Sequence, residues 1–254
     1  MDESGRLPVI APDWPAPAGV RAAVTTRAGG VSEGHHACLN LGTRCGDAQA
    51  AVAANRARLC RMLRLPAEPL WLDQRHGNAV VPAHAVSVGP VADASWTDRV
   101  GPVCAVLAAD CLPVLLCDDA GRCVAAVHAG WRGLAAGVVE AAVAALPVPP
   151  RRLLAWLGPA IGPAHFEVGE EVRTTFVAVD AQARLAFRPA AAPGKFYADL
   201  WLLARQRLRR AGVSRSFGGG LCTYSDGGRF FSHRRQPGGG RQAALIWLQS
   251  VPSG

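Results

Sequence analysis

Lysine is almost absent from this chain of 254 residues, because Lys195 is the only one and the net charge of +8 comes almost entirely from arginine. A basic chain can attract phosphate backbones. Here the arginines are dispersed, their densest group is Arg207, Arg209 and Arg210, and no aromatic-rich RNA-binding signature lies nearby. Arginine with abundant alanine, glycine and proline is typical of codon bias in a GC-rich genome. We therefore expect no nucleic acid as a partner.

Long apolar runs are missing as well. No stretch approaches the roughly 20 apolar residues of a membrane span, and none joins a basic start, an apolar run and a small-residue cleavage site. These absences predict a cytoplasmic protein without a membrane partner. The eight cysteines are then expected to be free thiols, since disulfides belong to oxidising compartments and small domains. Cys104 and Cys117 lie in apolar runs, which predicts core positions for both.

Histidine and methionine are also scarce, which argues against copper oxidase chemistry. Blue-copper sites use two histidines, a cysteine and usually a weak axial methionine. A laccase needs a further three-copper cluster held by many histidines, commonly in His-X-His pairs. The chain has seven histidines, two methionines and no His-X-His pair. Laccase activity is therefore not expected, and copper is a less suitable cofactor than zinc.

The composition favours one well-packed domain. Half of the residues are apolar, enough to bury a substantial core. No repeat, heptad or long linker divides the chain, which predicts a single domain over residues 1–254 with an irregular lead-in at residues 1–19. Continuously apolar segments, typical of strands covered on both faces, alternate with helical periodicity. We expect an α+β fold with α/β-like character, in which mixed sheets are covered by helices, and a monomer.

Periodicity and turn residues locate the elements. Strands are predicted at residues 20–26, 70–72, 79–81, 103–108, 113–117, 122–127, 152–157, 213–217 and 243–248. Helices are predicted from Asp47, a plausible N-cap, to about residue 65, and at residues 132–145, 169–179 and 199–211. The proline-rich residues 147–150 should end the second helix near residue 146.

Three short motifs each place a metal ligand beside glycine or proline at a predicted strand end. His76 lies in residues 74–77, Cys111 in residues 110–113 and His128 in residues 127–133. Each alone also fits a structural role, as a turn histidine or a core cysteine. Together they offer two imidazoles and a thiolate. Catalytic zinc typically takes three protein ligands and leaves a fourth position open, whereas structural zinc is usually closed by four. The sequence therefore predicts an open metal site.

Further polar residues lie near these motifs. A helix beginning near Arg132 would point free N–H groups toward the turn after His128, and its guanidinium could bind phosphate, although a solvent-facing arginine is the alternative. Asp110 could orient a ligand or shuttle a proton, or only form a turn. Asn40 could bind substrate or cap a turn. The remaining histidines are predicted in loops or at the surface: His35, His36, His84, His165 and His233.

The motifs, taken in order, resemble the laccase-domain or polyphenol oxidoreductase-like family, which includes purine nucleoside phosphorylases with adenosine deaminase activity and a peptidoglycan editing factor. The similarity spans nearly the whole chain and includes residues 25–32, 39–42, 46–47 and 55–56 besides the three ligand motifs. Departures occur at Ala160, Phe166 and His233, where the family often has cysteine, tyrosine and tyrosine. The resemblance implies zinc held by the three ligands of these motifs, His76, Cys111 and His128.

The activity implied by the resemblance is phosphorolysis of adenosine or inosine to free base and ribose 1-phosphate, with adenosine deamination as a second activity. The substrates would be a purine nucleoside and phosphate. Catalytic roles are then expected for Asp110 besides the three ligands. Residues expected to bind substrate are Arg27, Asn40, Arg132 and Arg241.

Other readings of the same residues stay open. Cys111 could act as a nucleophile with His128 or His76 as its base, which would give a hydrolase acting on cell-wall peptides. Editing of peptidoglycan precursors is implied by part of the family. A non-catalytic protein braced by zinc is a further alternative, which the lack of an evident fourth ligand disfavours.

Overall fold

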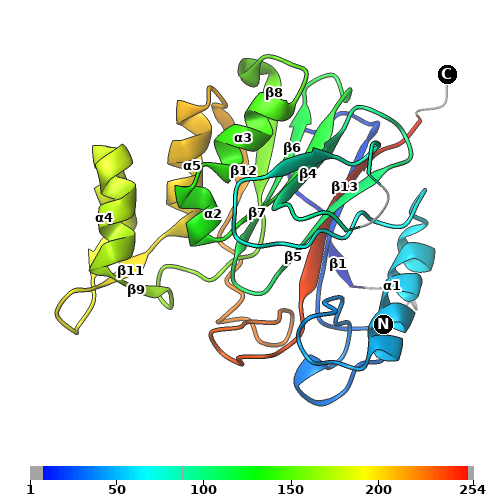
Figure 1. Cartoon of the computed structure of the whole chain (residues 1–254), viewed down its shortest axis with the longest axis horizontal. Coiled ribbons are helices and arrows are strands. Elements are labelled where there is room, and N and C mark those ends of the chain that lie inside the picture. Colours follow the sequence, from blue (N-terminus) through cyan, green and yellow to red (C-terminus); the bar gives the residue numbers. More distant parts are fainter. Residues whose placement is uncertain (1–7, 87–88, 251–254) are drawn as a thin grey trace.

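Two stacked β-sheets form the centre of the molecule, and helices cover their outer faces (Figure 1). The computed structural model describes residues 8–86 and 89–250, so residues 1–7 of the predicted lead-in lie outside the described residues. The strands are β1 (Val9–Ile10), β2 (Val20–Thr25), β3 (Val80–Pro82), β4 (Ala94–Thr97), β5 (Val103–Ala108), β6 (Leu112–Asp118), β7 (Val124–Ala129), β8 (Leu153–Leu157), β9 (Glu167–Gly169), β10 (Phe187–Pro189), β11 (Lys195–Ala198), β12 (Arg215–Gly218) and β13 (Gln242–Leu248). The α-helices are α1 (Gln49–Leu63), α2 (Trp131–Ala135), α3 (Val138–Ala145), α4 (Glu170–Val179) and α5 (Leu200–Arg210), and short 3-10 helices span Gly34–His36, Pro150–Arg152 and Ala181–Ala186. The predicted α+β fold is confirmed.

The larger sheet has the strand order β12-β8-β6-β7-β4-β3. Its central strands are antiparallel, whereas the edge strands β12 and β3 run parallel to their neighbours. The second sheet, of order β1-β2-β13-β5, is antiparallel throughout. A third sheet, β10-β11-β9, packs beside α4 at one side of the molecule (Figure 1). The six-stranded sheet is thus mixed, as the sequence predicted, whereas the other two sheets are antiparallel.

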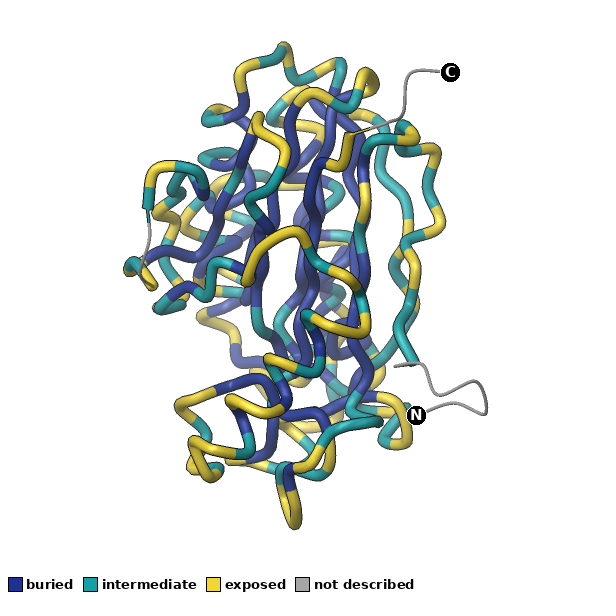
Figure 2. The backbone as a smooth tube through the Cα atoms, turned by 90° about the vertical axis from the view of Figure 1, so that its right-hand side faces the viewer, coloured by how far each residue is buried: buried dark blue, intermediate teal, exposed yellow. Residues whose placement is uncertain are grey.

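Strand β6 shows why the two sheets stack. Successive side chains of a strand point to opposite faces. Val114 and Leu116 pack in the cluster that includes α3 and α5, while Leu115 and Cys117 pack against the four-stranded sheet. Because both faces are covered, all seven residues of β6 are buried. Figure 2 shows the same burial along the stacked strands, with exposed residues concentrated in the loops. Helix α1 covers the outer face of the four-stranded sheet.

The helix predicted at residues 132–145 is two helices. Gly137 has a φ of 87°, a left-handed conformation that glycine adopts at little cost, and it separates α2 from α3. The prediction of Asp47 as a helix N-cap is wrong, because Ala48 holds that position. The Asp47 carboxylate instead accepts a hydrogen bond from the Asn40 amide, in the loop before the helix.

Several strand predictions also need correction. Residues 70–72 form no strand, only a bridge from Leu70 to β5. Strand β7 begins at Val124, two residues later than predicted, because the Asp118 carboxylate accepts the N–H groups of Arg122 and Cys123 and holds them in a turn. The short strands β1, β4, β9, β10 and β11 were not predicted, and β1, which pairs with β2, lies within the segment expected to be irregular.

The cysteines agree with the sequence prediction. All eight are free, and Cys104 and Cys117 are fully buried. Burial raises the pKa of both thiols to about 12, which keeps them protonated and unreactive. Over residues 8–86 and 89–250, no helix has the length and apolarity needed to cross a membrane.

Candidate metal centre

Three segments that are distant in sequence bring the predicted ligands together. His76 lies in the loop before β3, Cys111 in the turn between β5 and β6, and His128 in β7. Strands β6 and β7 pair so that Leu112 faces Ala129, which sets Cys111 beside the end of β7. One ligand atom from each of the three side chains lies within 4.8 Å of the other two. The predicted trio is therefore confirmed as a spatial cluster.

The spacing of the donor atoms suits a metal ion. The Sγ atom of Cys111 lies 3.6 Å from Nε2 of His76. Zinc–sulfur and zinc–nitrogen bonds of about 2.3 and 2.0 Å, meeting at a tetrahedral angle, would separate two such donors by about 3.6 Å. The imidazole rings of His76 and His128 are 4.9 Å apart between centroids and inclined at 74°. One thiolate and two imidazoles suit zinc, and the same donors are also found around copper.

Gly130 leaves the space between two of the ligands. A Cβ atom at this position would lie 2.8 Å from Cδ2 of His76 and 2.9 Å from Sγ of Cys111, closer than real Cβ contacts. Gly77, which directly follows His76 in sequence, does not provide such space. A Cβ there would meet only Oδ2 of Asp93, at an ordinary 3.6 Å. The open approach therefore depends on Gly130.

A carboxylate that the sequence reading did not single out lies behind the cluster. Oδ1 of Asp93 accepts hydrogen bonds from Nδ1 of His128 at 2.8 Å and from the backbone N–H of His76 at 2.9 Å. Its Oδ2 accepts from the backbone N–H of Gly77 at 2.7 Å and of Arg75 at 3.1 Å. The residue is 1% exposed. Burial raises the pKa of this carboxyl, but the bond from His128 and the backbone N–H groups hold it below its usual value, so it is ionised.

The thiol and the imidazole influence each other's protonation. Burial raises the pKa of Cys111, but the neighbouring charge of His128 and hydrogen bonds from both histidines lower it to about 6. Burial lowers the pKa of His128, yet the Cys111 thiolate and the Asp93 carboxylate raise it to about 9. Without a metal, the pair is therefore a thiolate and an imidazolium. Metal ligands must be deprotonated, so a cation would find the thiolate ready and would displace the proton of His128.

Asp110 does not contact the ligand side chains through its carboxylate. Oδ1 accepts a hydrogen bond from the Thr223 hydroxyl and Oδ2 one from the backbone N–H of Arg234, both at 2.6 Å. Its φ of 90° is unusual for a residue other than glycine. The carboxylate therefore ties the turn of Cys111 to the C-terminal loop that carries His233.

The cluster opens into a cavity of about 1210 Å³, larger than the roughly 300–1,000 Å³ typical of ligand pockets. All three ligands line it, and so do Arg132 and Arg241 from the predicted substrate-binding set. Arg132 is exposed and lies 4.5 Å over the ring of Trp131, and it forms no ion pair with any residue in the described part of the chain. An arginine without a carboxylate partner is free to bind an anionic ligand.

Two histidines predicted to be loop or surface residues also line the cavity. His233 is exposed in the C-terminal loop, and His84 lies edge-on to Trp96 with its Nδ1 atom 3.6 Å from the Asp98 carboxylate. A loop position was a sound inference for His233, but its neighbours in space could not be read from sequence. His233, at a position where the family often has tyrosine, therefore lies in the cavity wall.

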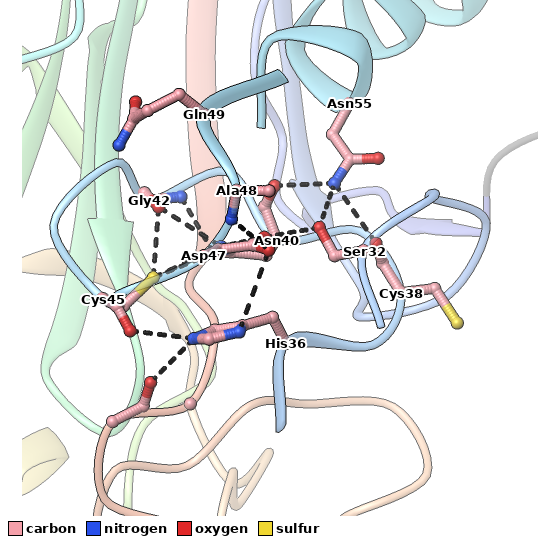
Figure 3. A network of polar contacts seen from close by, with 12 residues as sticks. Ser32, His36, Cys38, Asn40, Gly42, Cys45, Asp47, Ala48, Gln49 and Asn55 are labelled. Atoms are coloured by element: carbon pink, nitrogen blue, oxygen red, sulfur yellow. Dashed lines mark hydrogen bonds and ion pairs between the residues drawn. The ribbon is translucent and has the colours of Figure 1, made fainter. Parts of the chain in front are cut away.

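The structure does not bring Arg27 and Asn40 to the cavity. Two nitrogens of the Arg27 guanidinium donate to the carbonyl oxygen of Ala37 and a third to that of Gly227. Asn40 is fully buried in the polar network of Figure 3. Its Oδ1 accepts the backbone N–H groups of Gly42 and Arg241. Arg27 thus supports loops, and Asn40 holds the backbone of a cavity-lining arginine.

The fold and the site together define a class of protein: an α+β fold of stacked sheets that presents a His–Cys–His cluster able to hold a metal ion to a large cavity. The chain belongs to the multi-copper polyphenol oxidoreductase laccase family, whose model matches residues 21–249. This confirms the resemblance inferred from the motifs.

Relatives and solved structures agree with this membership. A Pseudomonas aeruginosa protein named purine nucleoside phosphorylase PA4543 is 57% identical over 240 residues, which cover 94% of this chain and 98% of that protein. Purine nucleoside phosphorylase YfiH of Escherichia coli is 51% identical, with coverage of 94% and 98%. The crystal structure of Neisseria meningitidis protein NMB0706 superposes with a TM-score of 0.92 at 48% identity, covering 95% of this chain and 99% of that one.

Proposed function

We propose that this protein is a purine nucleoside phosphorylase that binds zinc through His76, Cys111 and His128 and also deaminates adenosine. The observation that carries the proposal is the sharing of one cavity by the three-ligand cluster and Arg132, which has no ion pair with residues 8–86 or 89–250. Phosphorolysis needs both an anion site and a means of stabilising charge on the departing base. Relatives up to 57% identical, which carry the name purine nucleoside phosphorylase, support the same reaction.

The reaction assigns roles to the cavity residues. A phosphate oxygen forms a bond to C1′ of the ribose while the bond from C1′ to the purine nitrogen breaks, and the purine leaves with the bonding electrons and takes up a proton. Arg132 and Arg241 hold and orient the phosphate by charge-assisted hydrogen bonds.

Zinc, when bound, would supply Lewis acidity and positive charge beside the substrate. His76, Cys111 and His128 would hold it, and the space at Gly130 lets a ligand approach from the cavity side. Asp110 contributes by fixing the loop that carries His233. In deamination of adenosine, water adds to C6 of the purine ring, the bond from C6 to the amino nitrogen breaks, and ammonia leaves with inosine as the product. The same charge would assist this attack.

The decisive experiment combines metal analysis with product analysis. Protein purified without chelator is assayed for zinc and copper, then incubated with adenosine or inosine, with and without phosphate, and the products are separated by chromatography. We expect about one zinc per chain, and free base with ribose 1-phosphate only when phosphate is present. Inosine formed from adenosine without phosphate would report the deaminase activity. Zinc-loaded protein that releases no base from any purine nucleoside in phosphate would refute the phosphorylase assignment.

A thiol hydrolase is the second candidate, and the lowered pKa of Cys111 is the observation that favours it. A thiolate beside an imidazolium is the usual arrangement of a cysteine nucleophile. The two functions respond differently to alkylation. If an alkylating reagent leaves the zinc-loaded protein active, because the thiolate is already bound to metal, the hydrolase candidate is excluded.

A further inference from the structure

One buried carboxylate contacts the segments of two different metal ligands. Asp93 immediately precedes β4, and β4 pairs with β7 so that Ala94 faces Val127. This register places Asp93 next to His128, whose backbone N–H donates to the Asp93 carbonyl oxygen at 2.7 Å. The side chain is then held at the base of the cluster by its position directly before a sheet strand. Sites supported by sheet strands are held more precisely than sites supported by loops alone.

The bond to His128 determines which ring nitrogen can bind a metal. An ionised carboxylate has acceptors only. Nδ1 of His128, 2.8 Å from Oδ1 of Asp93, must therefore carry a hydrogen. A metal that displaces the second proton of the ring then binds at Nε2. The His128 side chain is 4% exposed and the Asp93 side chain 2%, so water has little access to this bond. The tautomer and the orientation of the ring are both fixed by Asp93.

The same carboxylate shapes the loop of the second ligand. The backbone N–H groups of Arg75, His76 and Gly77 all donate to it. His76 has a φ of 59°, a left-handed conformation that is uncommon outside glycine. Such a conformation persists only where the surrounding contacts enforce it. Three converging hydrogen bonds to one anion provide that enforcement, and the exposed His76 ring is thereby presented to the cavity.

We propose that Asp93 is the positioning residue of the metal centre, fixing the Nδ1–H tautomer of His128 and the loop conformation of His76 through one carboxylate. The inference rests on the proposed zinc binding, and it explains how two of the three ligands, His76 and His128, are held in place. Asp110, although adjacent to Cys111 in sequence, has no such part, because its carboxylate contacts Thr223 and Arg234.

The test is the zinc affinity of Asp93→Asn, measured on the full chain by competition with a chromophoric chelator. The asparagine side chain has the same size as that of aspartate but carries no charge. One of its two acceptor oxygens is replaced by an NH₂ group, which would face the N–H groups that donate to Asp93. Loss of a hydrogen-bond partner of a metal ligand typically weakens metal binding by about 10- to 100-fold, and we expect a loss in this range. Cobalt substituted for zinc should show shifted d–d absorption bands in the variant, which general destabilisation would not produce.

Asp118→Asn is the matched control. Asp118 is also a fully buried carboxylate that accepts two backbone N–H groups, but at the turn between β6 and β7, outside the cavity lining. It should lose stability and keep wild-type zinc affinity. Wild-type zinc affinity in Asp93→Asn, or an equal loss in Asp118→Asn, would overturn the positioning role. A wild-type protein without zinc affinity would refute the metal site itself, which is a different result.

A second measurement does not depend on the variant folding. In the zinc-loaded wild-type protein labelled with nitrogen-15 at histidine, two-dimensional spectra of the imidazole nitrogens should show His128 protonated at Nδ1 and coordinated through Nε2. Coordination of His128 through Nδ1 would overturn the inference, because that nitrogen would then have no proton to donate to Asp93.

Discussion

The hydroxyl of Thr223 donates a 2.6 Å hydrogen bond to the carboxylate of Asp110, linking two residues that are 113 positions apart. The other oxygen of this carboxylate accepts the backbone N–H of Arg234, the residue after His233. Cys111 and the C-terminal wall of the cavity are therefore joined through one side chain. Asp93 serves the metal ligands and Asp110 the cavity wall, so the two buried carboxylates have separable effects.

Asp110→Asn should reduce turnover while leaving the metal bound. Asparagine tolerates the positive φ at this position. Its side chain has one acceptor oxygen, so it can accept only one of the two hydrogen bonds that Thr223 and Arg234 donate to Asp110. We expect a loss of about 1–3 kcal/mol in the free energy of unfolding, unchanged zinc affinity, and a fall of about tenfold in kcat/KM, equivalent to about 1.4 kcal/mol. Denaturant unfolding, chelator competition and steady-state phosphorolysis measure the three quantities. Loss of zinc from this variant would contradict the division of roles.

Gly130→Ala should weaken metal binding without unfolding the protein. The backbone angles at Gly130, φ −62° and ψ 157°, are normal for alanine. The added Cβ would nevertheless press on His76 and Cys111. We expect zinc affinity to fall by at least about tenfold. This is the lower end of the loss seen when a hydrogen-bond partner of a metal ligand is removed. Gly77→Ala, whose Cβ meets only Asp93 at 3.6 Å, is the matched control and should keep its zinc. Equal zinc affinity in the two variants would disprove the role given to Gly130.

The candidate ligands could be found from sequence because each lies in a motif with glycine or proline. Cys111 and His128 also lie at the ends of strongly apolar strands, whereas His76 lies in a loop. Asp93 could not be found in the same way. Its partner His128 is 35 positions away, and the four-residue strand that follows it gives too little periodicity for a prediction. The registers of β4 with β7 and of β6 with β7, which assemble the site, depend on tertiary packing.

The predicted substrate-binding residues agree less well with the structure than the three candidate ligands, for a related reason. The motif containing Asn40 indicated a structured position, but a buried amide and a substrate-contacting amide have the same sequence signature. In the structure the Asn40 amide is used within the protein, as Figure 3 shows. Arg27 is likewise engaged by backbone carbonyls and lies outside the cavity lining. Arg132 and Arg241 line the cavity, although Arg241 also donates to the carbonyl oxygens of Gly239 and Gly240. The sequence alone does not show which of these arginines line the cavity, because that depends on the tertiary structure.

Arg132→Gln should raise the KM for phosphate more than the KM for the nucleoside. A hydrogen bond to a charged group contributes about 1.5–3 kcal/mol, so we expect the KM for phosphate to rise about 10- to 100-fold. Arg209→Gln is the control, because Arg209 is exposed on α5 and outside the cavity lining. Initial rates over a grid of both substrate concentrations separate the two constants. An equal rise in both values would contradict a phosphate-binding role.

Asp118→Asn should make stability less dependent on pH. Burial raises the pKa of Asp118, but the N–H groups of Arg122 and Cys123 and the Arg122 guanidinium hold it below its usual value. A carboxyl with a lowered folded-state pKa stabilises the fold above its unfolded pKa of about 3.9, and this stabilisation is lost as the pH falls through the folded-state value. The variant should therefore be less stable than wild type by about 1–3 kcal/mol at pH 7, and the difference should shrink below about pH 4. Urea unfolding of both proteins between pH 7 and 3, in chelator so that metal release does not contribute, measures this change. A difference that stays constant over the whole pH range would show that the Asp118 carboxyl titrates alike in the folded and unfolded chains.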